Sequence, residues 1–274
     1  MIYFPKEGIT ISNQSINKEY IKCQIDGRLG TVVVDYPPAN AMLLEAREEM
    51  VEILNELLGR EEIWVIVLTG AGSKFFISGA NIPELLPLTP EAAKKRVETS
   101  KRFTCYVENY PKPVICALNG LALGGGLELA LCCDFRLAAD HIKLGLPEVN
   151  LGIMPGGGGT QRLPRLIGMS RAKELIYTGS LISAHEALSL GIVDKVVPSD
   201  QLMMEAQKLA GKIMAKAPLA IRAAKQAINA GWNLSSEEGL DLENNLWANL
   251  FATEDKNEGV KAFLEKRTPS FRGR

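Results

Sequence analysis

Two glutamates in glycine-dense segments are the residues of this sequence best suited to chemistry. Glu128 ends the run Leu-Gly-Gly-Gly-Leu-Glu at 123–128, and Glu148 begins a segment that continues to four glycines at 156–159. A carboxylate in apolar surroundings loses its hydration, so it must find a partner or its pKa must change. Glycine has no Cβ, so backbone N–H groups can approach a ligand and stabilise a developing oxyanion. Two carboxylates beside exposed amides favour enolate chemistry.

Alternating strands and helices must position these residues. Two β-rich runs at 20–25 and 29–35 flank Asp26-Gly27-Arg28, which predicts a hairpin. Apolar spacing predicts a helix over 43–58, and Thr89-Pro90 predicts the start of another that runs to about Tyr110. Further segments predict strands at 63–69, 114–118 and 134–138, a strand breaking into a loop over 74–83, and a short helix at 126–132. This recurrence indicates a layered α/β core.

The pattern becomes helical beyond about Asp194. Helices are expected at 199–214, 218–230, 235–252 and 257–265. We therefore divide the chain into a catalytic core, 1–198, and a helical region, 199–274, that packs on this core or on a neighbour's. The sequence contains no evident repeat or flexible linker.

Composition and charge narrow the class of protein. The 274 residues are 46% hydrophobic and 23% charged with a net charge of −1, which is typical of a soluble globular protein without general attraction for nucleic acid. Five cysteines without metal-type spacing indicate reduced, mostly buried thiols. Met1–Thr10 lacks a signal-peptide pattern, and the apolar stretch 113–133 is interrupted by Asn119, Glu128 and four glycines, so a membrane span is not expected. A cytoplasmic location follows.

The glycines at 124–126 are also compatible with a simple turn between a strand and a helix. A dinucleotide-binding loop is disfavoured because Gly-x-Gly-x-x-Gly is absent at this junction and Glu128 would place negative charge near a pyrophosphate. The two histidines, His141 and His185, have no nucleophile elbow or ligand cluster around them, so serine-hydrolase and metal chemistry are not expected.

Four motifs in order resemble the crotonase, or enoyl-CoA hydratase/isomerase, superfamily over nearly the whole chain. They are Pro-Pro-Ala-Asn-Ala at 37–41, Leu-Thr-Gly-Ala-Gly at 68–72 leading to Phe-Ile-Ser-Gly-Ala at 76–80, Asn119-Gly120 through Glu128 to Asp134, and Pro147-Glu148 through Pro155 to Gly-Thr-Gln-Arg-Leu at 159–163. The resemblance implies a crotonase-like α/β spiral of ββα units followed by a C-terminal helical trimerisation region. It also implies homotrimers or homohexamers and a place in fatty acid metabolism.

The resemblance further implies an acyl-CoA thioester substrate. Its carbonyl oxygen would lie in an oxyanion hole made by the backbone N–H groups of Ala80 and Gly125, which follow Gly79 and Gly124. The implied CoA-binding residues are Ala39, Ser78, Ala80, Ile82, Phe263 and Lys266. No separate cofactor and no metal are expected, since coenzyme A is part of the substrate.

Carboxylates at both 128 and 148 resemble the hydratases within this superfamily. In that mechanism, Glu128 orients and deprotonates the water that attacks C3 of a 2-enoyl thioester, and Glu148 mediates proton delivery at C2. An enoyl-CoA isomerase, or a hydratase specialised for cyclic dienoyl or branched substrates, stays open because the sequence does not reveal the acyl pocket.

Other features depart from the hydratase pattern or suggest another class. Asn81 and Pro83 stand where many hydratases carry aspartate and lysine, so CoA contacts there are expected to differ. Phe263 and Lys266 fit a CoA contact made to an adjacent subunit, and equally an ordinary amphipathic terminal helix. RNA binding is disfavoured because the helix from Glu91 mixes acids with its cations and has no aromatic platform; those cations are Lys94, Lys95, Arg96, Lys101 and Arg102.

Overall fold

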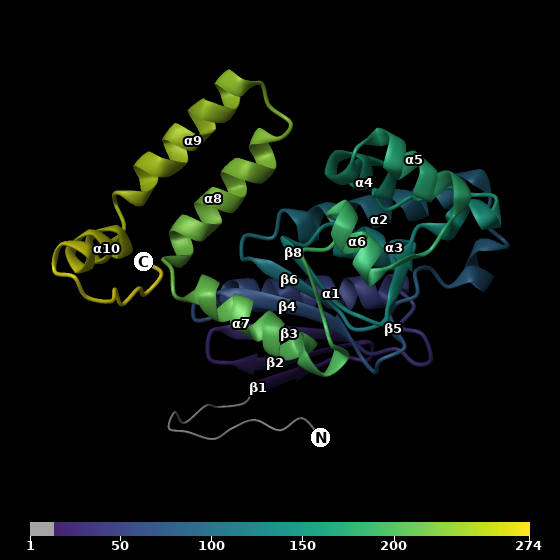
Figure 1. Ribbon diagram of the computed structural model, residues 1–274, viewed down its shortest axis with the longest axis horizontal. Helices are drawn as coiled ribbons and strands as arrows, with labels where there is room; N and C mark the ends of the chain where they lie inside the picture. The colour runs from purple at the N-terminus through teal and green to yellow at the C-terminus, as the bar shows by residue number, and fades with distance from the viewer. Residues whose placement is uncertain (1–13) are drawn as a thin grey trace.

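Two β-sheets and the helices around them form the body of the protein (Figure 1). The computed structural model describes residues 14–274, so Met1–Thr10 lies outside the described residues. The larger sheet has seven strands in the order β1-β2-β3-β4-β6-β8-β11, and the smaller has four in the order β10-β9-β7-β5. The strands are β1 (Gln14–Asn17), β2 (Ile21–Asp26), β3 (Leu29–Val34), β4 (Val65–Gly70), β5 (Phe75–Ile77), β6 (Val114–Leu118), β7 (Leu121–Leu123), β8 (Phe135–Ala139), β9 (Lys143–Gly145), β10 (Ile182–Ser183) and β11 (Lys195–Val197).

Ten α-helices and three short 3₁₀ helices are described between residues 14 and 274. The α-helices are α1 (Leu44–Gly59), α2 (Pro90–Glu108), α3 (Gly125–Ala130), α4 (Gly159–Ile167), α5 (Met169–Thr178), α6 (Ala184–Leu190), α7 (Leu202–Met214), α8 (Pro218–Gly231), α9 (Ser236–Leu250) and α10 (Glu254–Leu264). The 3₁₀ helices are η1 (Ile82–Leu85), η2 (Pro147–Leu151) and η3 (Ser199–Gln201).

A ββα unit repeats along the chain. In each unit the first strand joins the larger sheet, the second joins the smaller sheet, and a helix follows: β4-β5-α2, β6-β7-α3, and β8-β9 with η2 and α4. The expected spiral of ββα units is therefore confirmed. The repeat is not evident in the sequence because its helices differ in length, from 19 residues in α2 to six in α3.

Buried apolar strands hold the larger sheet in place. Every residue of β4 and β6 is buried, as expected for parallel strands covered on both faces. The helix α1 buries one face, through Ala46, Met50, Ile53, Leu54 and Leu57. The central strands of the larger sheet thus belong to the hydrophobic core.

Three parallel strands of the smaller sheet carry the functional segments. β5 pairs with β7, and β7 with β9, all in parallel, so their carboxyl ends lie at one edge. β5 ends just before Ser78–Ala80, β7 just before Gly124–Glu128, and β9 shortly before Glu148. Ligands of parallel sheets bind at this edge, so the topology gathers the candidate residues in one place.

The C-terminal helices extend from the body. α7 packs on β4, β6 and β8, whereas α8 and α9 form a hairpin that projects away, with α10 at the open end of this hairpin, near the start of α8 (Figure 1). This extension exposes large apolar side chains of α8 to α10, among them Ile228, Trp232, Leu240, Trp247, Phe251 and Phe263. The division of the chain at residue 198 stays a prediction.

Most elements expected from the sequence are present. The hairpin of β2 and β3 turns through Gly27 at φ 55°, and the Thr89 hydroxyl caps α2 by accepting the Ala92 amide at 3.3 Å. Strands β1, β7, β9, β10 and β11 were not expected, because two to four residues are too few to reveal a period of two. All five cysteines are free thiols and four are buried. No helix in residues 14–274 has the length and apolarity required to cross a bilayer.

Candidate active site

Gly79 brings the loop after β5 against the loop after β7. Its φ of 95° is a conformation that glycine adopts at little cost. A Cβ at this position would lie 2.9 Å from the Leu123 carbonyl oxygen and 3.5 Å from the Gly125 nitrogen, so a larger residue would push the loops apart. The next residue, Ala80, is half-buried, and its amide donates no hydrogen bond to any described residue. This amide is therefore available to a ligand.

Gly124 starts the short helix that carries Glu128. It has φ 51° and precedes Gly125, the first residue of α3. The first amides of an α-helix have no acceptor within the helix, so the Gly125 N–H is free to bind an oxygen. One turn later the Glu128 amide donates to the Gly124 carbonyl at 2.9 Å. The predicted oxyanion donors thus lie on adjoining loops.

Glu128 is buried, and its two oxygens have different surroundings. Its side chain is 4% exposed, and Oε1 accepts the amides of Gly157 at 2.7 Å and Gly159 at 2.8 Å. Since Gly159 is the first residue of α4, the carboxylate lies at a helix N-terminus, which favours negative charge. Oε2 accepts no hydrogen bond from residues 14–274 and is the oxygen left for a ligand.

Opposing effects act on the ionisation of Glu128. Burial raises the pKa of this carboxyl above its usual range. The amides of Gly159 and Gly157 and the positive charges of Arg162 and Arg47 counteract that rise in pKa. Its surroundings therefore contain specific groups that favour the ionised form.

Glu148 lies in surroundings that favour the protonated form. It is part of η2, and its Oε2 is buried without a hydrogen-bond partner among the described residues. Its Oε1 lies 3.0 Å from where a Cβ on Gly124 would stand, so a side chain at 124 would collide with it. Burial, aided by the negative charge of Glu128, raises the pKa of Glu148 to about 7. The two carboxyls thus differ in their hydrogen bonds: Glu128 accepts two backbone amides, whereas the buried Oε2 of Glu148 accepts none from the described residues.

Two buried or half-buried asparagines fix the chain from the end of β4 through β5, which leads to Ala80. Asn40 donates to the carbonyls of Ala71, Phe75 and Phe76 and accepts the Tyr36 amide. Asn119 bonds both the amide and the carbonyl of Gly70, at 3.0 and 2.8 Å. These contacts tie the Pro-Pro-Ala-Asn-Ala motif to β5, and the Asn-Gly motif to the end of β4.

The predicted CoA-binding residues fall into two groups. Ser78 donates its amide to the Ala39 carbonyl at 3.2 Å, and Ile82, 48% exposed, begins η1 just after Ala80. Phe263, 82% exposed, and Lys266 belong to α10 and the segment after it, and α10 lies on the far side of the molecule from α3 (Figure 1). A single chain does not bring these two residues to Glu128.

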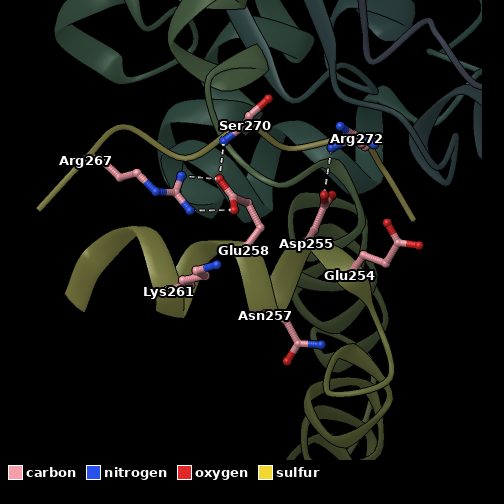
Figure 2. A pocket seen from close by; sticks show the side chains of 8 residues that line it. All are labelled: Glu254, Asp255, Asn257, Glu258, Lys261, Arg267, Ser270 and Arg272. Carbon is pink, nitrogen blue, oxygen red and sulfur yellow. Dashed lines mark hydrogen bonds and ion pairs between the residues drawn. The ribbon is translucent and has the colours of Figure 1, made fainter. Parts of the chain in front are cut away.

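A concave region between α10 and the C-terminal tail is a second candidate (Figure 2). Its central carboxylates already have partners. Glu258 accepts Arg267 at 2.7 and 2.9 Å and the Ser270 amide at 2.7 Å, and Asp255 accepts the amides of Arg272 and Gly273. These bonds fasten the tail to α10, so we assign this region a structural role.

Sequence reasoning missed the groups that hold Glu128. Gly157 and Gly159 were noted only as part of a motif, and Arg162 was given no role. A glycine run just before a helix is the signal that could have found them, because such a segment offers amides to an anion. Among residues 14–274, no cluster of potential ligands for a metal ion is present.

Known proteins resemble this chain in sequence and in fold. A family model described as enoyl-CoA hydratase/isomerase matches residues 25–274. A crotonyl-CoA hydratase of Syntrophomonas wolfei is 41% identical over 92% of this chain and 98% of its own. A short-chain-enoyl-CoA hydratase of Clostridium acetobutylicum is 43% identical over 88% of this chain and 93% of its own. The crystal structure of an enoyl-CoA hydratase from Bacillus anthracis has a TM-score of 0.89 at 43% identity, covering 93% of this chain and all of that one.

Proposed function

Because the chain belongs to the enoyl-CoA hydratase/isomerase family, we propose that it is an enoyl-CoA hydratase. It adds water across the C2=C3 bond of a 2-enoyl-CoA thioester to give the 3-hydroxyacyl-CoA. The observation that carries this proposal is the pair of carboxyls at one sheet edge: Glu128, whose Oε1 accepts two backbone amides while Oε2 is left open, and Glu148, whose Oε2 is buried without a partner among the described residues and whose pKa is raised to about 7.

The thioester carbonyl oxygen is placed between the amides of Ala80 and Gly125. Negative charge develops on this oxygen when a nucleophile adds at C3, and fixed N–H donors stabilise it without reorganisation. Removing one such donor costs about 10²–10³ in kcat in other enzymes. The free state of both amides supports this assignment.

Glu128 is assigned as the base and Glu148 as the acid. Oε2 of Glu128 accepts a proton from water as its oxygen bonds to C3, and the proton of Glu148 passes to C2. The substrate gains one water in total. A proton then returns from Glu128 to Glu148 and restores the starting protonation of both carboxyls. Acid and base catalysis of this kind contributes roughly 10²–10⁴ in rate.

CoA is proposed to bind across two copies of the chain. Ala39, Ser78, Ala80 and Ile82 would contact CoA from one copy, and Phe263 and Lys266 from its neighbour. The apolar side chains exposed on α8 to α10 support a homotrimer or homohexamer, since an exposed apolar face of this extent marks an interface. The free thiols support a cytoplasmic location.

An enoyl-CoA isomerase is the alternative within the family, and nucleic-acid binding is not proposed. Moving a double bond needs the same carboxyls but takes up no water. Of the cations on α2, Arg96 is paired with Glu84 at 2.9 Å, which reduces the charge open to an RNA.

A substrate panel tests the proposal. Purified protein is mixed with straight-chain 2-enoyl-CoA esters of increasing length and with branched and cyclic dienoyl esters, and loss of the conjugated thioester's ultraviolet absorbance is followed. The names of the relatives support short chains as the first choice. We expect hydration of at least one ester, with turnover strongly reduced in Glu128→Gln and Glu148→Gln at nearly unchanged affinity. Failure of every ester would contradict the proposal.

A further inference from the structure

Arg162 joins three parts of the protein beside Glu128. Its Nε and Nη2 donate to the two carboxylate oxygens of Glu108 at 3.0 and 2.7 Å, and its Nη1 donates to the Gly157 carbonyl at 3.0 Å. Only 14% of the Arg162 side chain is exposed. A bidentate guanidinium–carboxylate pair has a fixed geometry, so Arg162 has little freedom to move away from Gly157.

The loop that Arg162 holds is the one that binds Glu128. Gly157 donates its amide to Oε1 of Glu128 and accepts Arg162 at its carbonyl. The Arg162 amide donates in turn to the Gly158 carbonyl at 2.9 Å. A run of glycines is costly to order because its backbone has more freedom than that of any other residue. The guanidinium supplies the restraint that this run lacks.

Glu108 connects this loop to more distant elements. It is the last residue of α2, and its carbonyl accepts Asn229 of α8 at 2.9 Å. The Arg162–Glu108 pair is therefore anchored by two helices outside the loop, α2 and α8. The positive charge of Arg162 also opposes the rise in the pKa of Glu128. Arg47, the other cation with this electrostatic effect, instead donates to Ser100 at 2.6 Å, and its side chain forms no hydrogen bond with the loop among the described residues.

We propose that Arg162, held by Glu108, is a positioning residue for the hydration reaction. It fixes the Gly157–Gly159 loop so that two amides bind Oε1 of Glu128 and Oε2 faces the attacking water. This inference rests on the proposed function for the identity of that water, and on the described contacts for the rest.

Arg162→Gln is the direct test, with Arg165→Gln as the matched control. Arg165 is an exposed arginine three residues further along α4, and among residues 14–274 its side chain bonds only Gln161. For Arg162→Gln we expect kcat to fall by about 10², the effect of a small misplacement of a reacting group, with little change in KM. The acid limb of the pH–rate profile should move to higher pH. Arg165→Gln should match the parent in all three measurements.

A second readout does not depend on turnover. Protein enriched in ¹³C at the glutamate carboxyls is titrated by NMR, with the Glu128 signal assigned by its loss in Glu128→Gln. Arg162→Gln should raise the pKa of Glu128, because the amides are less well held and a positive charge is gone. Should that variant not fold, Arg162→Lys and Glu108→Gln replace it, and both should change this pKa in the same direction.

The two readouts separate this inference from the proposed function. If the parent protein hydrates no acyl thioester, the proposed function fails while the NMR titration still decides the role of Arg162. If folded Arg162 and Glu108 variants keep the parent's Glu128 pKa, Arg162 is not a positioning residue.

Discussion

The amide nitrogen of Gly157 lies 2.7 Å from Oε1 of Glu128. This contact and the one from Gly159 occupy a single oxygen of the carboxylate and leave Oε2 without a partner among the described residues. A carboxylate held in this way keeps a fixed orientation. These hydrogen bonds compensate for the burial of a carboxylate that is only 4% exposed.

Gly157→Ala should impair turnover more than folding. A Cβ at 157 would lie 2.6 Å from Oε2 of Glu128, so the carboxylate must turn away from its present orientation. We expect kcat to fall by about 10² with little loss of affinity. Gly211→Ala in α7 is the control, because nothing lies within 4 Å of the Cβ it would add. Steady-state kinetics and thermal melts of both variants check this; parent-like kcat in folded Gly157→Ala contradicts it.

Gly125→Pro should remove one oxyanion donor with limited disturbance of the fold. Gly125 is the first residue of α3, a position where proline is favoured and where the amide has no acceptor within the helix. We expect kcat to fall by about 10²–10³. Gly125→Ala keeps the N–H and adds a Cβ only 3.9 Å from the Gly79 Cα, an ordinary contact, so it should stay active. Equal kcat in the two variants would remove this amide from the mechanism.

The rate should depend on pH through Glu148. Burial raises the pKa of this carboxyl from 4.5 to about 7, and the proposed acid must be protonated. We therefore expect kcat/KM to decline as pH rises through about 7. The Glu148→Gln variant should lack this basic limb. A profile in which Glu148→Gln retains the parent's basic limb would assign that limb to another group.

The same carboxyl should make stability depend on pH. Between pH 4.5 and about 7 the folded state holds a proton on Glu148 that the unfolded chain has lost. Folded protein that binds more protons loses stability as pH rises, so this contribution to the free energy of unfolding declines across that window. Glu148→Gln should flatten the decline and melt higher than the parent at pH 8. Thermal melts across this pH range measure it, and parallel curves for the two proteins would argue against the burial of Glu148.

Lys266 should lower the stability of the protein and contribute to CoA binding. It has φ 53° just after α10, where its amide donates to Phe263 and the next amide to Ala262, the pattern in which glycine is usual. This conformation costs an L-residue about 1–2 kcal/mol, so Lys266→Gly should melt higher than the parent. Its KM for the CoA ester should rise, as in Lys266→Ala, but not its KM for the pantetheine ester, which lacks the nucleotide. Equal rises in KM for both esters would show that Lys266 does not contact the nucleotide of CoA.

Much of the fold was accessible from the sequence because its elements carry strong local signals. The buried strand β6 was predicted residue for residue, and the start of α2 followed from Thr89 and Pro90. The division of the strands between two sheets was not predicted, since it depends on which strands pair. Three-residue strands such as β7 and β9 leave no period to detect.

Some residues of the candidate site were also predicted from the sequence, whereas others were not. Glu128 and Glu148 stood out because a carboxylate in an apolar, glycine-dense run has a cost. The role of Arg162 was invisible, since an arginine on an amphipathic helix is ordinary until its partners are known. Glu108 is 54 residues away in sequence, and only the fold brings it to Arg162.

Oxygen incorporation tests hydration most directly. Crotonyl-CoA is incubated with the protein in H₂¹⁸O, and the product is analysed by mass spectrometry alongside the Glu128→Gln variant. We predict 3-hydroxybutyryl-CoA with one ¹⁸O in its hydroxyl group, formed far more slowly by the variant. Unlabelled product, migration of the double bond without uptake of oxygen, or an equal rate of labelling by Glu128→Gln would contradict the proposed mechanism.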